Sequence, residues 1–259
     1  WLIFESEGVY LGRKTVIWLY DLYASRYNAI KSNDEVEEHL YLAVPLMEAI
    51  APRDDPMVLD VAAGTGRIGK TLCQHPNFEG QIIALDLSLK MLLQGVNDFA
   101  QMHFEGYITW IHAADSPLPF EDSSFDVVTC MEALEFLPDA GTALAEMARV
   151  LRPGGLLLTT RRINTKWLPG KTWPEDQMSA ALESCGFENI EFQIWQRDYD
   201  LVWARRVGQS SFLGPQMLEE VLRCPACFST ITVADARVRC TECAQVFRFS
   251  EERVLRLHR

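Results

Sequence analysis

The sequence predicts an α/β fold with a doubly wound, mostly parallel seven-stranded sheet, followed by a small C-terminal metal-binding module. Two observations support this fold class. Between residues 57 and 160, short and nearly continuous apolar runs alternate with helical stretches, which is typical of parallel strands covered by helices on both faces. Near the C-terminus, four of the seven cysteines fall within twenty residues, and such clustering indicates a metal site rather than a secreted disulfide framework.

Composition limits the class of protein. The 259 residues, 48% of them hydrophobic, suffice for one large domain, or for a domain of roughly 200 residues plus a module. No apolar run approaches the ~20 residues of a membrane helix, so we expect no membrane partner. The thiol cluster favours a cytoplasmic location. The sequence leaves open the oligomeric state and whether residues precede Trp1.

Charge is distributed unevenly along the chain. The net charge is −12, yet residues 205–259 hold nine arginines, no lysine and only six acidic residues. The strongly acidic remainder repels a phosphate backbone at long range, which disfavours unaided binding of nucleic acid. The basic tail is still able to act locally on an anionic partner.

The sequence predicts the following cap, strands and helices. Residues 1–50 form an aromatic-rich helical cap, with a helix over Asp34–Ile50 that Pro45 kinks. Strands are expected at Met57–Val61, Gln81–Leu85, Thr109–Ala113, Asp126–Cys130, Gly155–Thr160, Ile190–Gln196 and Asp200–Arg206, and helices at Ile68–Gln74, Leu89–Ala100 and Gly141–Leu151. The short link between the last two strands requires an antiparallel hairpin. We expect domains at residues 51–207 and 216–259, joined by a linker at 208–215.

A glycine-rich turn follows the first strand of the sheet. Gly64, Gly66 and Gly69 spell G-x-G-x-x-G, and Asp86 lies twenty residues after Gly66, which taken alone fits a dinucleotide site. Asp60, however, stands inside the end of the strand, where its charge would repel a pyrophosphate and attract a cationic amino-acid group. A nicotinamide oxidoreductase is therefore the weaker interpretation.

Five segments in order resemble the class I S-adenosylmethionine-dependent methyltransferases, whose fold is Rossmann-like. They are Tyr20–Asn28, Val58–Gly66, Ala84–Leu92, residues 114–128 and Arg149–Gly155, and the resemblance covers roughly residues 15–206. It implies an α/β sheet that binds S-adenosyl-L-methionine at the carboxyl ends of its strands. Many members carry glycine where this chain has Ala62, so the approach to the ligand is tighter here.

The resemblance assigns roles around that cofactor. Asp86 would accept hydrogen bonds from both ribose hydroxyls, and Asp115 would accept one from the adenine amino group. Asp60 would face the methionine end of the cofactor. The implied cofactor-binding residues are Asp60, Ala62, Gly64, Gly66, Asp86, Leu87, Ala114, Asp115, Cys130 and Met131. Gly69 fits helix–strand packing better than ligand contact.

The residues of the chemical step are less clear. Methyl transfer requires an in-line nucleophile at close range, and a base only where the acceptor is protonated. Candidates for a catalytic role are Tyr27, Glu132 and Glu135, although a solvated helix start or a cap contact is the stronger interpretation of the two glutamates. Candidates for the acceptor pocket are Tyr27, Arg161, Trp167 and Trp173. Arg161 and its neighbour Arg162 are suited to an anionic acceptor group, or form a solvated pair.

The tail carries two C-x-x-C pairs twelve residues apart. Four converging thiolates of Cys224, Cys227, Cys240 and Cys243 are the chemistry of structural Zn²⁺. Residues 218–257 also resemble a small zinc-ribbon family that activates several tRNA, ribosomal and translation-factor methyltransferases. The resemblance implies a fused zinc ribbon. Because apolar residues alternate with arginine near the end of the tail, we expect its apolar face to dock on the acidic domain.

These observations favour an S-adenosylmethionine-dependent methyltransferase acting on a small molecule, which the acidic catalytic region and the aromatic N-terminal cap support. The acceptor atom is not identified. One alternative is a methyltransferase whose acceptor is a translation-related macromolecule such as tRNA, rRNA or protein, with the zinc ribbon as docking module. Another is a non-catalytic scaffold that keeps the cofactor fold.

Overall fold

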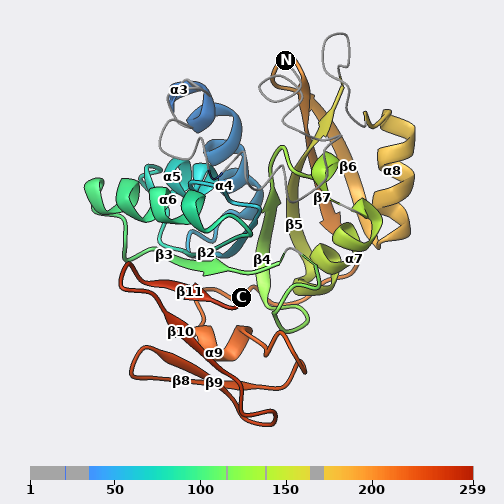
Figure 1. The fold of residues 1–259 in the computed structure, drawn as a ribbon. Coiled ribbons are helices and arrows are strands. Elements are labelled where there is room, and N and C mark those ends of the chain that lie inside the picture. Colours follow the sequence, from blue (N-terminus) through green and yellow to red (C-terminus); the bar gives the residue numbers. More distant parts are fainter. Residues whose placement is uncertain (1–20, 22–34, 115, 138, 164–171, 259) are drawn as a thin grey trace.

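A mixed β-sheet of eleven strands runs through the computed structural model, which describes residues 21, 35–114, 116–137, 139–163 and 172–258 (Figure 1). The strands are β1 (Met57–Val61), β2 (Gln81–Asp86), β3 (Ile108–His112), β4 (Phe125–Cys130), β5 (Leu151–Arg162), β6 (Phe187–Ile194), β7 (Tyr199–Arg206), β8 (Ile231–Ala234), β9 (Arg237–Cys240), β10 (Val246–Phe249) and β11 (Val254–Arg256). Their spatial order is β6-β7-β5-β4-β1-β2-β3-β11-β10-β9-β8. The α/β prediction is therefore confirmed.

The sheet is mixed, and it is larger than the seven strands expected. Strands β1 to β5 pair in parallel, and β7 lies antiparallel to both β5 and β6, as the short link between β6 and β7 requires. The prediction of seven strands is wrong because β11 pairs in parallel with β3. An edge strand presents unpaired N–H and C=O groups that accept a further strand, and the tail supplies it.

Helices cover both faces of the parallel part of the sheet (Figure 1). The helical segments are α3 (Glu35–Glu38), η3 (His39–Ala43), α4 (Val44–Ile50), α5 (Arg67–Cys73), α6 (Leu89–Gln101), η4 (Leu134–Phe136), α7 (Ala140–Val150), α8 (Glu175–Ser184) and α9 (Leu218–Val221). Residues of α4, α5 and α6 share one buried cluster, and residues of α7 and α8 share the other. Among the described residues, every helix is too short or too polar to traverse a lipid bilayer.

The helix expected over Asp34–Ile50 is interrupted near Pro45, as predicted. The segment His39–Ala43 is a π-helix, and α4 restarts with Pro45 in its first turn. Proline has no N–H and its ring clashes with the carbonyl of the preceding turn, so the backbone widens before it.

Residues 208–215, expected as a linker, are tied to the start of β4 by a buried carboxylate. Asp126 is fully buried and accepts hydrogen bonds from the backbone N–H groups of Met57, Leu213 and Gly214 at 2.9–3.0 Å. The Arg152 guanidinium supplies the opposite charge, with Nε 2.6 Å from Asp126 Oδ1. This set of donors fixes the direction in which the chain enters the tail.

The tail packs on the larger part of the molecule rather than standing apart from it (Figure 1). Leu222 bridges to Phe120, and Arg223 forms an ion pair with Glu121. Leu255 and Leu257 belong to the same buried cluster as the core of β4 and α7. The apolar face of the tail is therefore covered, as the alternation of apolar residues and arginine predicts.

Removing the tail is expected to destabilise what remains. A chain of residues 1–214 loses the partner of β3, and its melting temperature should lie clearly below that of the full chain. In the full chain, Leu255→Ala removes a fully buried side chain at a cost of about 2–5 kcal/mol, or roughly 5–15 °C. Glu251→Ala, at an exposed position in the adjoining turn, serves as the control. Equal melting temperatures for the full and shortened chains would contradict the packing.

Candidate functional site

The carboxyl ends of the parallel strands bring the predicted site residues to one edge of the sheet. β1 ends after Asp60, β2 ends at Asp86, and β4 ends at Cys130. The order β4-β1-β2 makes these strand ends neighbours. The expected residues Tyr27, Asp115 and Trp167 lie outside the described part of the chain.

The glycine turn closes against Asp86. The Gly64 N–H donates to Asp86 Oδ2 at 2.8 Å, and the Ser88 N–H donates to Asp86 Oδ1 at 2.7 Å. Gly66 has a φ of +81°, and a Cβ there would lie 2.6 Å from the Trp110 ring, so only glycine fits. The two backbone donors fix the carboxylate in place at the end of β2.

Two other positions of the turn have structural explanations. Ala62 has a φ of +56°, a left-handed conformation that glycine adopts more easily, so the alanine is strained where the resembling family carries glycine. A Cβ on Gly69 would lie 3.0 Å from the Phe99 ring and 3.2 Å from Ile108. Gly69 thus permits close packing of α5 against the sheet, as expected from the sequence.

Asp60 is a buried carboxyl with an altered affinity for protons. Its side chain is 2% exposed, and the Thr129 hydroxyl donates to Asp60 Oδ1 at 2.7 Å. Burial is the main cause that raises the pKa of Asp60 to about 7, and the charge of Asp86 raises it further. The Thr129 hydrogen bond and the charge of Arg67 act in the opposite direction. A cation placed beside Asp60 would restore the charged form.

Arg67, which the sequence analysis did not select, connects several parts of this edge. It forms ion pairs with Glu38 and, at 2.7 Å, with Glu132, and its guanidinium lies 4.5 Å from the centre of the Trp195 ring. Its Nη2 atom is buried without a hydrogen-bond partner. The only available signal was its place directly after Gly66, at the start of α5.

The remaining cofactor candidates lie around the same strand ends. Cys130 is fully buried, and its carbonyl accepts the Thr159 hydroxyl at 2.7 Å. Leu87, Ala114 and Met131 are partly exposed. The Leu87 carbonyl contacts His112 Nε2 at 3.0 Å, which fixes the loop after β2 against β3.

The two candidate glutamates differ in their surroundings. Glu132 has a φ of +51°, donates its N–H to the Thr160 hydroxyl at 2.7 Å and is ion-paired with Arg67. Glu135 is 6% exposed and accepts a hydrogen bond from the Tyr199 hydroxyl. Neither is a solvated helix start, because both carboxylates are held by partners within the fold.

Arg161 and Arg162 also differ, although they are adjacent. Arg161 forms ion pairs with Asp200 and, at 2.7 Å, with Glu175, and it donates to the Trp173 carbonyl at 3.0 Å. Arg162 is 4% exposed, and no hydrogen bond or ion pair joins its guanidinium to a described residue. The pair is therefore not solvated, and Arg162 is the one whose charge lacks a partner among these residues.

The four tail cysteines converge. Their sulfur atoms all lie within 4.8 Å of one another, with 3.6 Å between Cys224 and Cys243 and 3.4 Å between Cys227 and Cys240. These separations exceed a disulfide bond of about 2.05 Å. They approach the spacing of about 3.8 Å that four sulfurs adopt at 2.3 Å from a tetrahedral zinc ion. The donor set fits Zn²⁺.

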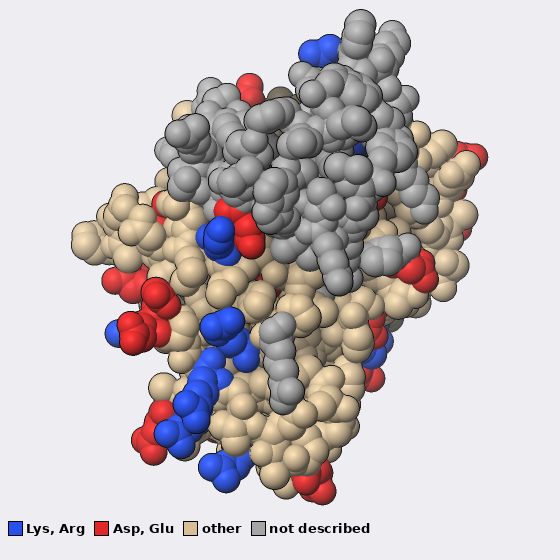
Figure 2. Space-filling model, viewed as in Figure 1, with Lys and Arg blue, Asp and Glu red and all other residues tan. Residues whose placement is uncertain are grey.

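A row of cationic residues crosses the outer strands of the sheet. Arg237 pairs with Arg248, Arg248 with Arg256, Arg256 with His112, and His112 with Asp86. The three arginines are exposed, and Figure 2 shows basic side chains gathered in a band over the tail strands. Arginines directly opposite one another repel. The row of paired residues that ends at Asp86 thus begins with three exposed arginines. We call Arg237, Arg248 and Arg256 the arginine row.

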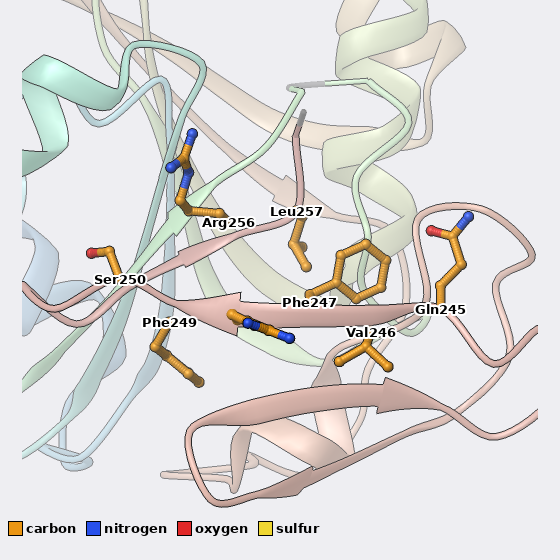
Figure 3. A pocket seen from close by; sticks show the side chains of 8 residues that line it. Gln245, Val246, Phe247, Phe249, Ser250, Arg256 and Leu257 are labelled. Carbon is orange, nitrogen blue, oxygen red and sulfur yellow. The ribbon is translucent and has the colours of Figure 1, made fainter.

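A pocket of about 360 Å³ lies beside the arginine row. Arg248 and Arg256 line it together with apolar residues of β10 and the end of the chain. In Figure 3 the side chains of Phe247 and Leu257 lie next to each other in this pocket. The pocket is on the tail, away from the strand ends that carry Asp60 and Asp86.

Comparison with known proteins identifies the central part of the chain. A family model described as a methyltransferase domain matches residues 59–159, a segment that contains the glycine turn, Asp86 and the end of β4. Residues 59–159 are thus similar to a methyltransferase domain, the name used for them below. The domain includes every sequence-predicted cofactor residue.

Relatives of the methyltransferase domain are found among curated proteins and solved structures. The ubiquinone/menaquinone biosynthesis C-methyltransferase UbiE of Francisella philomiragia is 30% identical over 146 residues, which are 56% of this chain and 58% of the relative. The chain thus spans somewhat more than half the length of the curated relatives it matches.

Two solved structures share the fold at low sequence identity. The [4+2]-cyclase SpnF has a TM-score of 0.62 and 18% identity, covering 76% of this chain and 97% of that one. A chain in the complex of the Haloferax volcanii Trm112 methyltransferase activator with a candidate methyltransferase has a TM-score of 0.58 and 17% identity, covering 73% and 98%. Identities this low establish the fold alone.

Proposed function

We propose that this protein is an S-adenosylmethionine-dependent methyltransferase with a small-molecule acceptor. The observation that carries the proposal is the carboxylate of Asp86, fixed at the end of β2 by the N–H groups of Gly64 and Ser88. A carboxylate at this point is suited to a ribose diol. The relatives named as ubiquinone/menaquinone C-methyltransferases support transfer to a small molecule.

The charges at the site suit the amino-acid end of this cofactor. Asp60 is buried, has a pKa of about 7 and would bind the ammonium group in its charged form. The buried Arg67 Nη2 atom lacks a hydrogen-bond partner and would bind the carboxylate. The glycine turn, where a Cβ on Gly66 would clash, leaves room for close approach. Leu87, Ala114, Cys130 and Met131 would complete the cofactor site, with Asp115 at the adenine.

When bound, the cofactor supplies an activated methyl group on a sulfonium centre. The chain's own contribution is to orient the acceptor and to exclude water. Glu132 is engaged by Arg67 and would act as a positioning residue for that guanidinium. Glu135, hydrogen-bonded to Tyr199, is the better candidate to receive a proton from an acceptor hydroxyl or carbon.

We further propose that the tail is a zinc ribbon whose metal is structural. Four sulfurs occupy all positions of a tetrahedral ion, so no position remains for catalysis. The tail pairs with β3 of the methyltransferase domain, which agrees with the resemblance to a docking module. We propose the boundaries 51–207 for the catalytic domain, preceded by the cap at 1–50, and 216–259 for the ribbon.

A second candidate function is methyl transfer to a nucleic acid. The observation that favours it is the arginine row, which is in register with Asp86. Guanidinium groups bind phosphate through paired hydrogen bonds. The net charge of −12 opposes this candidate, so we rank it below a small-molecule acceptor.

The cofactor assignment is tested by calorimetry with S-adenosylhomocysteine. Asp86→Ala removes a charge-assisted contact and should weaken binding by about 30–150-fold, or roughly 2–3 kcal/mol. Glu79→Ala, an exposed acid just before the other end of β2, should leave binding unchanged. Absence of binding to the wild-type chain would overturn the proposed function. If the cofactor binds, methyl transfer from labelled cofactor into small-molecule fractions would identify the acceptor.

Cofactor affinity should depend on pH through Asp60. The free carboxyl has a pKa of about 7, and an adjacent ammonium group lowers it, so binding releases a proton below that pH. Affinity should therefore rise with pH up to about 7 and level off above it, with a slope of up to about tenfold per pH unit. Calorimetry from pH 5.5 to 8 measures this profile. If Asp60→Asn gives the same pH profile as the wild-type chain, the Asp60 carboxyl is not the cause of the pH dependence.

The metal assignment predicts one zinc ion per chain by elemental analysis. Cys240→Ser should release the ion and unfold the tail, because metal binding and folding are coupled in such small modules. Cys185→Ser changes a thiol outside the cluster and should leave the zinc content unchanged. A fully folded tail in strong chelator would be incompatible with a structural zinc site.

The second candidate is tested by fluorescence anisotropy with labelled single-stranded RNA at several salt concentrations. If the arginine row binds phosphates, Arg248→Glu should weaken binding at least tenfold and reduce its salt dependence. Arg197→Glu, exposed between β6 and β7, is the matched control. Equal affinities of the two variants would remove the nucleic-acid candidate.

A further inference from the structure

We infer that Arg162 binds an anionic group of the acceptor, so that the substrate is a small carboxylate or phosphate ester rather than a neutral molecule. The inference rests on the proposed methyltransferase function and specifies its substrate class. It is drawn from the position of Arg162 on β5, from its burial and from its lack of a counterion among the described residues.

Arg162 stands beyond the end of the neighbouring strand. Cys130, the last residue of β4, pairs with Thr159 of β5. β5 continues for three more residues, or about 10 Å of extended chain, and ends at Arg162. Figure 1 shows β5 projecting past β4 on the side of the strand ends. The projecting part of β5 therefore forms a wall next to the place proposed for the methionine end of the cofactor.

The face of β5 that carries Arg162 belongs to the site. Thr160, two residues earlier and on the same face, accepts the N–H of Glu132. Tyr199, the register partner of Arg162 on β7, donates its hydroxyl to Glu135. Arg162 is thus a neighbour of two residues, Thr160 and Tyr199, that form hydrogen bonds with the candidate glutamates.

Burial without a counterion is costly for this side chain. Arg162 is 4% exposed, and its Nε has no hydrogen-bond partner. A guanidinium keeps its proton at any physiological pH, so it cannot lose its charge by deprotonation. A buried ion is retained at such a cost only when a partner satisfies it. Within the described residues no acid does so, and a bound anion would.

Arg161 provides the contrast that makes Arg162 unusual. It comes from the same strand, one residue earlier, and projects to the opposite face. There it meets Asp200 and Glu175, so its charge is balanced within the fold. Arg161 is thus paired with two acids, whereas Arg162 has none among the residues that the structure describes.

The cofactor itself does not account for Arg162. β5 is separated from β1 by β4, which places it about 10 Å from the strand that leads into the glycine turn. Arg67, at the start of α5 directly after that turn, has a buried unpaired Nη2 suited to the cofactor's carboxylate. Arg162 is therefore available to the acceptor, which it would bind through two parallel hydrogen bonds.

The test compares two adjacent substitutions by thermal unfolding with S-adenosylhomocysteine present. Arg162→Met removes an unbalanced buried charge and should leave the melting temperature of the anion-free protein unchanged or higher. Arg161→Met leaves the buried Asp200 carboxylate without its guanidinium partner and should lower the melting temperature by several degrees. The probes are sodium benzoate and inorganic phosphate, with neutral benzamide as the matched control.

In the wild-type chain, benzoate or phosphate at about a hundredfold excess over its dissociation constant should raise the melting temperature by roughly 5–10 °C, and benzamide should not. Arg162→Met should abolish that rise, Arg162→Lys should weaken anion affinity about tenfold, and Arg161→Met should retain the rise. The affinity for S-adenosylhomocysteine should be the same in the wild-type and Arg162→Met chains.

Three results would overturn the inference. They are a loss of stability in Arg162→Met equal to that in Arg161→Met, an anion-induced rise that survives in Arg162→Met, and a loss of cofactor affinity in Arg162→Met. The last result would reassign Arg162 to the cofactor. Failure of S-adenosylhomocysteine to bind the wild-type chain would instead reject the proposed function, so the two failures are distinguishable.

Discussion

The Asp126 carboxylate is the interaction on which the arrangement of the molecule depends. It is completely buried at the start of β4, and its two oxygens accept three backbone N–H groups and one guanidinium contact. Those donors come from the start of β1, the start of β5 and residues 213–214. A buried carboxylate is tolerated only when it is satisfied in this way. One side chain thereby aligns the central strands and sets the path of the chain into the tail.

From that point the tail becomes part of the same sheet. Leu222 meets Phe120, and β11 then adds to β3 in parallel. The opposite end of the same strands carries Asp60, Asp86 and the glycine turn. Residues at the amino edge of the sheet therefore position the tail, while residues at the carboxyl edge form the site, and the strands connect the two rigidly.

Much of the fold and of the cofactor site follows from local sequence patterns. The span predicted for β1, Met57–Val61, is the observed one, and the antiparallel hairpin of β6 and β7 is confirmed. Glycine at residues 64 and 66 fits their positive φ angles in the turn after β1. Each of these features depends on residues close together in the chain, where periodicity and turn chemistry carry the signal.

The features that the sequence did not predict depend on contacts between distant residues. The sequence marks Arg161 and Arg162 as equivalent, and only the acids supplied by α8 and β7 distinguish them. The role of Arg67 depends on Glu38 and Glu132, which come from separate segments. The eleven-stranded sheet likewise results from two edges that meet in space. No local pattern encodes which strand a basic, alternating segment will join.

The order of the strands in the chain has a consequence for biosynthesis. β3 ends at His112, but its outer neighbour β11 consists of Val254–Arg256, which is made much later. During translation, the edge of β3 therefore stays open until Val254–Arg256 have been made and have left the ribosome. An open edge invites pairing with other chains, and contacts between residues so far apart form slowly. The nascent chain thus passes through a period of aggregation risk, which lasts until β11 pairs with the edge of β3.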